Sequence, residues 1–391
     1  MKQVRGFKYR FYPTSAQRLE LAQTFGCTRF VYNWALALRT NSYYQDNVAL
    51  SYTDTSNALT KLKKDPEKPW LKQVSAVPLQ QGLRHLNTAF INFFAGRNKY
   101  PKFKKKNGRQ SAHYAPNAFK WVDGKLTLAK MSQPLLIRWS RYFTGEPKSV
   151  TISVDPSNRY FVSFLVEEKL EQWNKTALKD TASHKGKIGV DLGVKDVMVT
   201  STGFASGNPK HYQKYQARLK TLQRRLAKKK KGSNNRYKAR LKVAKLHAKI
   251  ADCRKDFLHK LTTQLVRENQ AIYTETLAVK NMMANHKLAK AIADCGWGEA
   301  LRQFQYKCQW HDRKLGAIDR WFPSSKRCNP CGHILDKLPL GVREWTCPSC
   351  NNLNLRDKNA ALNILAVGQT VTACGSGNGG EIDLLSLAIQ G

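Results

Sequence analysis

Three acidic residues lie where a metal ion could bind them. Asp191 and Glu275 each end a short apolar run, and Asp357 opens a helical pattern, in a chain with 67 Lys and Arg against 27 Asp and Glu. An ionised carboxylate in an apolar strand is costly unless it is paired or bound to a cation. Carboxylate oxygens from three distant segments suit Mg²⁺, which takes its other ligands from water and substrate phosphate. These residues therefore predict a Mg²⁺ site.

Four of the nine cysteines form two Cys-x-x-Cys pairs. The pairs are Cys328 with Cys331 and Cys347 with Cys350, and 15 residues separate them. Pro and Gly beside the pairs are typical of the tight turns that present thiolates to zinc. The spacing predicts a Cys₄ ribbon with one structural Zn²⁺, and the alternative is four unconnected thiols.

The charge of the chain indicates a polyanionic partner. A formal net charge of +40 and a pI near 10.0 favour nucleic acid. Attachment to a membrane is the weaker interpretation, because no window holds the ~18 apolar residues that a spanning helix needs and the first 11 residues are too polar for a signal peptide. The odd number of unevenly spaced cysteines also argues against a disulfide framework.

Two basic segments are candidates for nucleic-acid contact. Residues 97–106 alternate cations with aromatic rings, which suits phosphates and unstacked bases. Residues 228–231 are consecutive lysines at the bend of a predicted helical hairpin. A lysine-guarded strand edge and a merely solvated helix face remain the alternatives. The candidate contacts are Lys102, Lys104, Lys105, Lys228, Lys229 and Lys230.

The patterns of the N-terminal half predict strands with a helical insertion. A strand over 3–11 is followed by a helix that Thr14 and Gln17 cap, with Leu19, Ala22 and Phe25 inward. Further helices are expected from about residue 28, over 51–64, and from Pro78 to Phe94. Alternating runs over 126–128, 135–139, 149–154 and 160–166 predict strands, with a turn at 155–158 and a polar linker near 170–185. We expect a small β-barrel or sheet interrupted by a helical subdomain.

The patterns of the C-terminal half predict an α/β domain. We expect a hairpin over 187–200, a helical hairpin over 212–268, a strand over 271–275, a helix over 297–314, a strand over 317–321 and a helix from Asp357. A strand that carries Asp191, a later strand that carries Glu275 and a C-terminal helix that carries Asp357 fit the RNase H-like arrangement. The predicted class is α+β and multidomain.

Several motifs resemble those of TnpB, the transposon-encoded proteins with a RuvC-type nuclease that are related to type V CRISPR effectors. The resemblance covers nearly the whole chain. Its motifs are IGVDLG (188–193), TETLAVKNM (274–282), FPSSKRC (322–328), RDKNAALNI (356–364), both cysteine pairs, YRFYP (9–13), TRFVYN (28–33), YPKFKK (100–105) and DFLHK (256–260).

The resemblance implies a domain plan. It places a β-barrel wedge domain at 1–11 and 97–185, a helical recognition subdomain at 12–96 and an RNase H-like (RuvC) nuclease domain at 186–322 and 351–366. The zinc ribbon spans 323–350, and a flexible tail follows at 367–391.

The resemblance also implies an activity: RNA-guided cleavage of double-stranded DNA. A guide RNA from the transposon end pairs with the target, and Asp191, Glu275 and Asp357 hold two Mg²⁺ or Mn²⁺ ions for phosphodiester hydrolysis. Tyr52, Ser56 and Gln80 are candidates to contact a short motif beside the target. We expect a monomer in the cytoplasm of a prokaryote, associated with the nucleoid.

Two departures from the family pattern keep alternatives open. Thr276 follows the glutamate where an acid is common, and Asn354 with Leu355 stands where His-Asp is common. The three metal-binding acids are all present, so we expect catalytic competence. The alternatives are a guided or sequence-specific DNA-binding protein that does not cut, and a DDE-type transposase.

Overall fold

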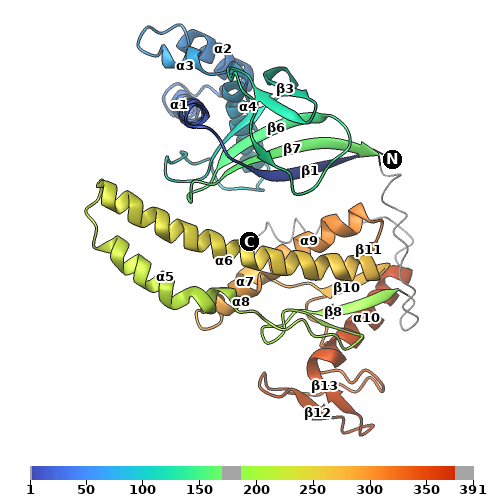
Figure 1. The fold of residues 1–391 in the computed structure, drawn as a ribbon. Coiled ribbons are helices and arrows are strands. Elements are labelled where there is room, and N and C mark those ends of the chain that lie inside the picture. Colours follow the sequence, from blue (N-terminus) through green and yellow to red (C-terminus); the bar gives the residue numbers. More distant parts are fainter. Residues whose placement is uncertain (1, 170–185, 375–391) are drawn as a thin grey trace. The chain divides into compact units, whose positions relative to one another are not determined.

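The computed structural model describes residues 2–169 and 186–374, and the chain divides into two compact units (Figure 1). Unit 1 comprises Met1–Glu171 with Lys229–Lys245, and unit 2 comprises Gln172–Lys228 with Leu246–Gly391. The polar linker predicted near 170–185 lies outside the described residues. Of the helices in the described ranges, none combines the length and the apolar character that crossing a membrane requires.

Unit 1 contains a five-stranded antiparallel sheet in the order β2-β6-β7-β1-β5. The alternation predicted for 160–166 is confirmed, since Val162, Phe164 and Val166 are buried while Leu165 is exposed. Asn158 turns the chain between β6 and β7 with φ 61°, as the turn residues indicated. The strands are β1 (Lys2–Phe11), β2 (Gln110–Tyr114), β5 (Ile137–Arg138), β6 (Pro147–Val154) and β7 (Tyr160–Lys169), beside the hairpin β3 (Phe119–Val122) and β4 (Lys125–Leu128).

The helices of unit 1 are α1 (Ser15–Asp46), α2 (Tyr52–Leu62), α3 (Trp70–Gln73) and α4 (Ala76–Phe94). The predicted capping box is confirmed: the Gln17 N–H donates to Thr14 Oγ1 at 3.3 Å, and the Thr14 N–H donates to Gln17 Oε1 at 3.1 Å. The expectation of two helices before residue 47 is wrong, because α1 continues through Gly26. A glycine inside a helix lowers helix stability by only about 1 kcal/mol relative to alanine. The burial of the side chains on both sides of Gly26 outweighs this loss.

Two of the three side chains predicted to face inward near the start of α1 are exposed. Leu19 is 73% exposed, and Ala22 also faces solvent. Phe25 is buried as predicted, and Leu21 joins it on the inward face of this part of α1. The prediction was wrong for Leu19 and Ala22, because periodicity alone does not say which face meets the sheet.

Unit 2 contains a four-stranded sheet in the order β11-β10-β8-β9. β8 (Lys187–Asp191), β10 (Ala271–Glu275) and β11 (Lys314–Ile318) are parallel, and β9 (Val199–Thr200) is antiparallel to β8. The two faces of β10 enter different cores: Ile272 packs with α6, α8 and α9, whereas Tyr273 packs with α10. The sheet therefore has helices on both faces.

The helices of unit 2 follow the predicted order with shifted ends. α9 ends at Trp310, before the predicted 314, and β11 begins at Lys314, before the predicted 317. Asp312 adopts φ 52°, and this left-handed turn stops the helix. The helices are α5 (His211–Ala227), α6 (Asn234–Glu268), α7 (Val279–Met282), α8 (Ala289–Cys295), α9 (Trp297–Trp310) and α10 (Arg356–Cys374), and α6 belongs to unit 1 up to Lys245.

The prediction of a flexible tail over 367–391 is wrong for its first residues. Residues 367–374 continue α10, and 375–391 lie outside the described residues.

Two glycines let α10 lie close to the sheet. A Cβ at Gly189 would lie 2.1 Å from the Ala361 carbonyl oxygen, and a Cβ at Gly368 would lie 2.4 Å from the Tyr273 ring. Because α10 begins at Arg356, this packing also positions Asp357 above the sheet.

Candidate nuclease and zinc sites

The structure brings the predicted acids to the carboxyl edge of the parallel sheet. Asp191 ends β8 and Glu275 ends β10, and the register pairs Val190 with Thr274 immediately before them. Asp191 and Glu275 share a side-chain hydrogen bond. Asp357 lies in the first turn of α10, which packs on β8. Three segments far apart in the sequence thus meet at one edge.

Asp191 and Glu275 form a largely buried pair of carboxyl groups. Burial raises the pKa of Asp191 well above its usual range, and repulsion from Glu275 and Asp357 raises it further. Burial also raises the pKa of Glu275, although Asp191 and the Leu192 backbone N–H donate hydrogen bonds to it. The shared hydrogen bond requires a proton on one carboxyl group, which we assign to Asp191. Two such groups fit a divalent cation, because the cation can replace that proton.

Arg343 forms an ion pair with Asp357, the third acidic residue. Its Nη1 lies 3.3 Å from Asp357 Oδ1 and 3.4 Å from Oδ2, and both side chains are partly exposed. Within residues 2–169 and 186–374, the only group of three or more potential ligands with all donor atoms within 4.8 Å is the cysteine cluster, so the acids are not drawn together as tightly. The sequence did not indicate Arg343, because a single arginine between the cysteine pairs carries no pattern.

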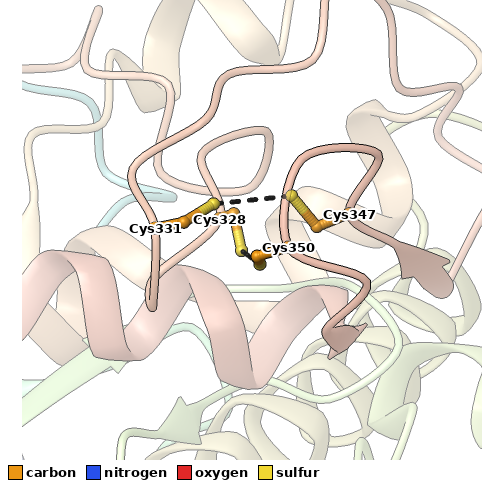
Figure 2. Close-up of side chains that lie close together, drawn as sticks. All are labelled: Cys328, Cys331, Cys347 and Cys350. Atoms are coloured by element: carbon orange, nitrogen blue, oxygen red, sulfur yellow. Dashed lines mark hydrogen bonds between the residues drawn. The ribbon is translucent and has the colours of Figure 1, made fainter.

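The four predicted cysteines converge (Figure 2). Cys328 Sγ lies 3.7 Å from Cys350 Sγ, and Cys331 Sγ lies 3.5 Å from Cys347 Sγ. A tetrahedral zinc with Zn–S bonds of about 2.3 Å needs sulfurs about 3.8 Å apart, so the cluster fits that ion. A hydrogen bond from the His333 backbone lowers the pKa of Cys331 to about 7, which favours the thiolate that binds metal. The short strands β12 (Glu344–Thr346) and β13 (Leu353–Leu355) complete the ribbon.

Two asparagines attach the ribbon to the helix that carries Asp357. Asn359 Nδ2 donates to the Arg327 carbonyl at 2.7 Å, and its Oδ1 accepts the Asn329 N–H at 3.0 Å. Asn363 Nδ2 donates to the carbonyls of Ser324 at 2.8 Å and Arg327 at 2.7 Å. These bonds fix the first cysteine turn against α10, which couples the cysteine cluster to the sheet edge that carries the acids.

The predicted nucleic-acid contacts lie mostly at the surface. Gln80, Lys102, Lys105 and the lysines 228–230 are exposed, whereas Tyr52 and Ser56 are half-buried. The Tyr52 ring lies 5.2 Å from the Arg84 guanidinium. Lys104 has a structural contact as well, since its Nζ lies 4.0 Å from the centroid of the Tyr32 ring and Asn33 bonds both its N–H and its carbonyl.

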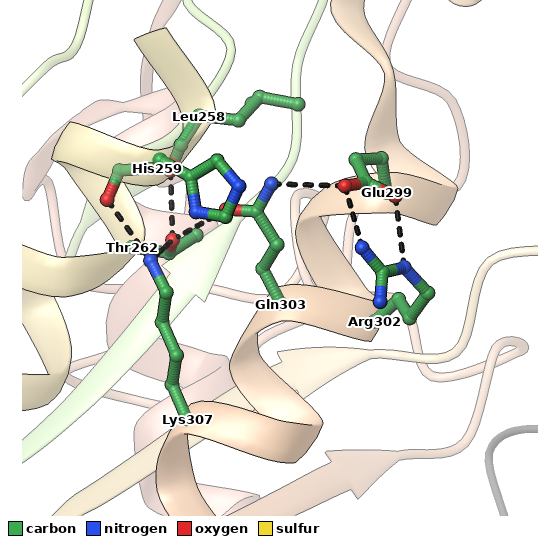
Figure 3. A network of polar contacts seen from close by, with 7 residues as sticks. All are labelled: Leu258, His259, Thr262, Glu299, Arg302, Gln303 and Lys307. Atoms are coloured by element: carbon green, nitrogen blue, oxygen red, sulfur yellow. Dashed lines mark hydrogen bonds and ion pairs between the residues drawn. The ribbon is translucent and has the colours of Figure 1, made fainter. Parts of the chain in front are cut away.

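A buried lysine network, which the sequence did not indicate, joins α6 to α9 (Figure 3). Lys307 Nζ donates to the His259 carbonyl at 2.9 Å and to the hydroxyls of Thr262 and Thr263 at 2.7 Å each. Gln303 accepts from Thr262 and donates to Glu299. His259 takes part in this network through its backbone carbonyl, while its side chain is exposed.

The fold resembles that of Cas12f1. The solved cryo-EM structure of a Cas12f1–sgRNA–target DNA complex matches with a TM-score of 0.58 and 12% identity, over 93% of this chain and 98% of that one. Family models match as "Helix-turn-helix domain" over 1–47, "Probable transposase" over 161–286 and "Cas12f1-like, TNB domain" over 297–364. The class is thus a Cas12f1-like fold of mixed α and β content.

Two curated relatives identify the family. A Streptomyces pristinaespiralis protein named "Putative RNA-guided DNA endonuclease" is 52% identical over 96% of this chain and 92% of its own length. InsQ of Escherichia coli, which bears the same name, is 33% identical over 96% of this chain and 95% of its own length. The chain belongs to the TnpB family of insertion-sequence proteins.

Proposed function

We propose that this protein is an RNA-guided DNA endonuclease that cuts at a metal site formed by Asp191, Glu275 and Asp357. The observation that carries the proposal is the meeting of Asp191 and Glu275 at the ends of parallel neighbours β8 and β10, below the first turn of α10. The names of the curated relatives agree with this activity.

The proposed chemistry is hydrolysis of a phosphodiester bond. Divalent ions, which we propose to be two Mg²⁺ or Mn²⁺, would supply an activated water and stabilise the leaving oxygen. Asp191 and Glu275 would hold them once their shared proton is lost, and Asp357 would join after leaving Arg343. No side-chain nucleophile is required, so the cysteines and histidines have no covalent role.

Replacing the acids tests the site. Asp191→Ala, Glu275→Ala and Asp357→Ala should each abolish cleavage and leave guided DNA binding nearly intact, because each removes a metal ligand and few binding contacts. The matched control is Asp312→Asn, which removes an exposed carboxylate at the opposite end of β11 and tolerates its left-handed backbone. Near wild-type cleavage by any alanine variant would refute the assignment.

We propose that a transposon-end guide RNA and double-stranded target DNA are the partners. The net charge of +40 supports binding to phosphates, which carries no sequence information by itself. Base pairing would then supply specificity, while Tyr52, Ser56 and Gln80 would read a short flanking motif. Lys102, Lys104, Lys105 and lysines 228–230 would contact backbone phosphates.

Exchanging the guide RNA tests whether base pairing with the guide determines the cleavage position. Protein loaded with either of two guides should cut one plasmid at two different positions, each set by its guide. Cutting at one position with both guides, or by RNA-free protein, would favour a transposase instead. Guided binding without any cut would favour a DNA-binding protein.

We propose that Cys328, Cys331, Cys347 and Cys350 hold one structural Zn²⁺. The sulfur spacing supports a closed tetrahedral site. Cys347→Ser should release the ion, loosen the ribbon and lower cleavage through α10. Elemental analysis of protein purified without chelator should find one zinc per chain, and its absence would end this assignment.

We also propose the finer architecture. The sheet of unit 1 would close as the wedge β-barrel at 1–11 and 97–185, and α1 to α4 would form the recognition subdomain at 12–96. The sheet of unit 2 would be the RNase H-like (RuvC) domain at 186–322 and 351–366, with the ribbon at 323–350. A monomer in the cytoplasm of a prokaryote, associated with the nucleoid, fits this proposal.

A further inference from the structure

An exposed tryptophan lies near the carboxyl edge that holds the acids. Trp321 is 78% exposed, whereas large aromatic side chains are usually buried or partly buried. It follows β11, whose last residue Ile318 pairs with Glu275 in the parallel register. Three residues of chain reach at most about 11 Å, so Trp321 lies within a few nucleotides' length of the acidic edge.

The turn that carries Trp321 is held at both ends. Ile318 and Phe322 pack in the core beside α10, which fixes the chain on either side of residues 319–321. Asp319 Oδ1 accepts the Trp321 N–H at 2.7 Å, and the Asp319 carbonyl accepts the Phe322 N–H at 3.2 Å. These contacts fix the backbone of the turn, so the indole of Trp321 is presented at the surface.

A cation lies over the indole. The Arg320 guanidinium is 4.8 Å from the centroid of the Trp321 ring, and both side chains are exposed. An aromatic face combined with a cation suits single-stranded nucleic acid, because the ring stacks on a base while the cation meets a phosphate. A protein partner would more often meet a larger apolar patch.

We propose that Trp321 and Arg320 form a stacking platform for a nucleobase of the DNA strand being cut. The platform positions the neighbouring phosphodiester at Asp191, Glu275 and Asp357, so this inference rests on the proposed nuclease function. Trp321 is a positioning residue, and it stacks on any base because every base presents a π face.

Cross-linking tests the platform directly. The guide-loaded Asp191→Ala protein binds target DNA with 5-iodouracil at successive positions of each strand and is irradiated. We expect a cross-link to Trp321 at one or two adjacent positions, and its loss in Asp191→Ala/Trp321→Ala. A cross-link pattern unchanged by the second substitution overturns the proposal.

Single-turnover cleavage provides the second readout. Trp321→Ala should cut about tenfold more slowly, with guided binding to the duplex changed less than about twofold, whereas Trp321→Phe should restore most of the rate. The matched control is Leu340→Ala, which truncates an apolar side chain that is 74% exposed in the ribbon. Slow cleavage together with lost zinc or a lower Tm would show a structural role and overturn the platform.

The outcomes separate this inference from the nuclease proposal. If Asp191→Ala protein still cuts, the site assignment fails whatever Trp321 does. If Asp191→Ala abolishes cutting and Trp321→Ala cuts at the wild-type rate, only the platform fails.

Discussion

At the proposed metal site, Arg343 would compete with a divalent cation for the Asp357 carboxylate. Both Asp357 oxygens lie within 3.4 Å of Arg343 Nη1, so the proposed ion would have to displace this ion pair. Exposed ion pairs stabilise by less than about 1 kcal/mol, so Arg343→Ala should raise Mn²⁺ affinity by up to about fivefold. Calorimetric titration of the RNA-bound, DNA-free protein measures this, with Arg302→Ala, which breaks the ion pair to Glu299, as control. Unchanged or weaker Mn²⁺ binding by Arg343→Ala would contradict the competition.

Lys307 should make stability depend on pH. Burial lowers the pKa of Lys307 to about 8, with repulsion from Arg267 adding to the effect. In the unfolded chain Lys307 keeps its proton up to about pH 10.4, whereas in the folded protein it loses the proton above about pH 8. Burial of the charged ammonium therefore lowers the free energy of unfolding below about pH 8, and this loss disappears as the pH rises to about 10.4. The unfolding free energy of the wild type minus that of Lys307→Met should therefore rise by about 2 kcal/mol between pH 7 and 9.5.

Urea unfolding at a series of pH values measures this difference. Lys260→Met, which removes a 77% exposed lysine from α6, is the control and should not show the rise. A wild-type minus Lys307→Met difference that stays flat or falls with pH would show that the three oxygen acceptors of Lys307 outweigh its burial.

At the scale of elements, the contact between α10 and β8 decides where Asp357 lies. Gly189→Ala would place a methyl group 2.1 Å from the Ala361 carbonyl and 2.7 Å from the Leu365 nitrogen, so the helix must move. Overpacking of this kind costs typically about 1–3 kcal/mol, and we expect cleavage to fall as well because Asp357 moves with α10.

Denaturant unfolding and single-turnover cleavage together test this contact. Gly298→Ala is the matched control, because a Cβ there meets nothing within 4 Å inside α9 and should stabilise by about 0.5–1 kcal/mol. Wild-type stability and cleavage in Gly189→Ala would mean that α10 does not depend on this close approach.

At the scale of the whole molecule, charge should govern affinity for RNA. A net charge of +40 implies many phosphate contacts, and each contact releases counterions. If about four or more phosphates are engaged, affinity should fall about tenfold or more for each doubling of salt. Replacing Lys228, Lys229 and Lys230 by Gln should reduce the slope of log affinity against log salt by up to about three. Filter binding of the guide RNA measures both slopes, and an unchanged slope would remove these lysines from the interface.

The sequence by itself determined the features that depend on local pattern. Thr14 and Gln17 predicted a capping box because both partners lie within one turn. Apolar runs that end at Asp191 and Glu275 predicted strands ending there, and the cysteine spacing predicted a cluster whose sulfurs do converge. The cap and the strand ends depend on a few neighbouring residues, and the cysteines lie within one segment, at most 22 positions apart.

Only the tertiary structure decided the features that depend on distant partners. The face of α1 that is buried, the pairing of Arg343 with Asp357, the network of Lys307 and the need for glycine at 189 all follow from which elements pack together. Asn363 reads as an ordinary polar residue of a helix, yet it bonds a chain segment 36 and 39 residues away. No local pattern encodes such pairs, because the free energy that selects them arises only when the sheet, α10 and the ribbon meet.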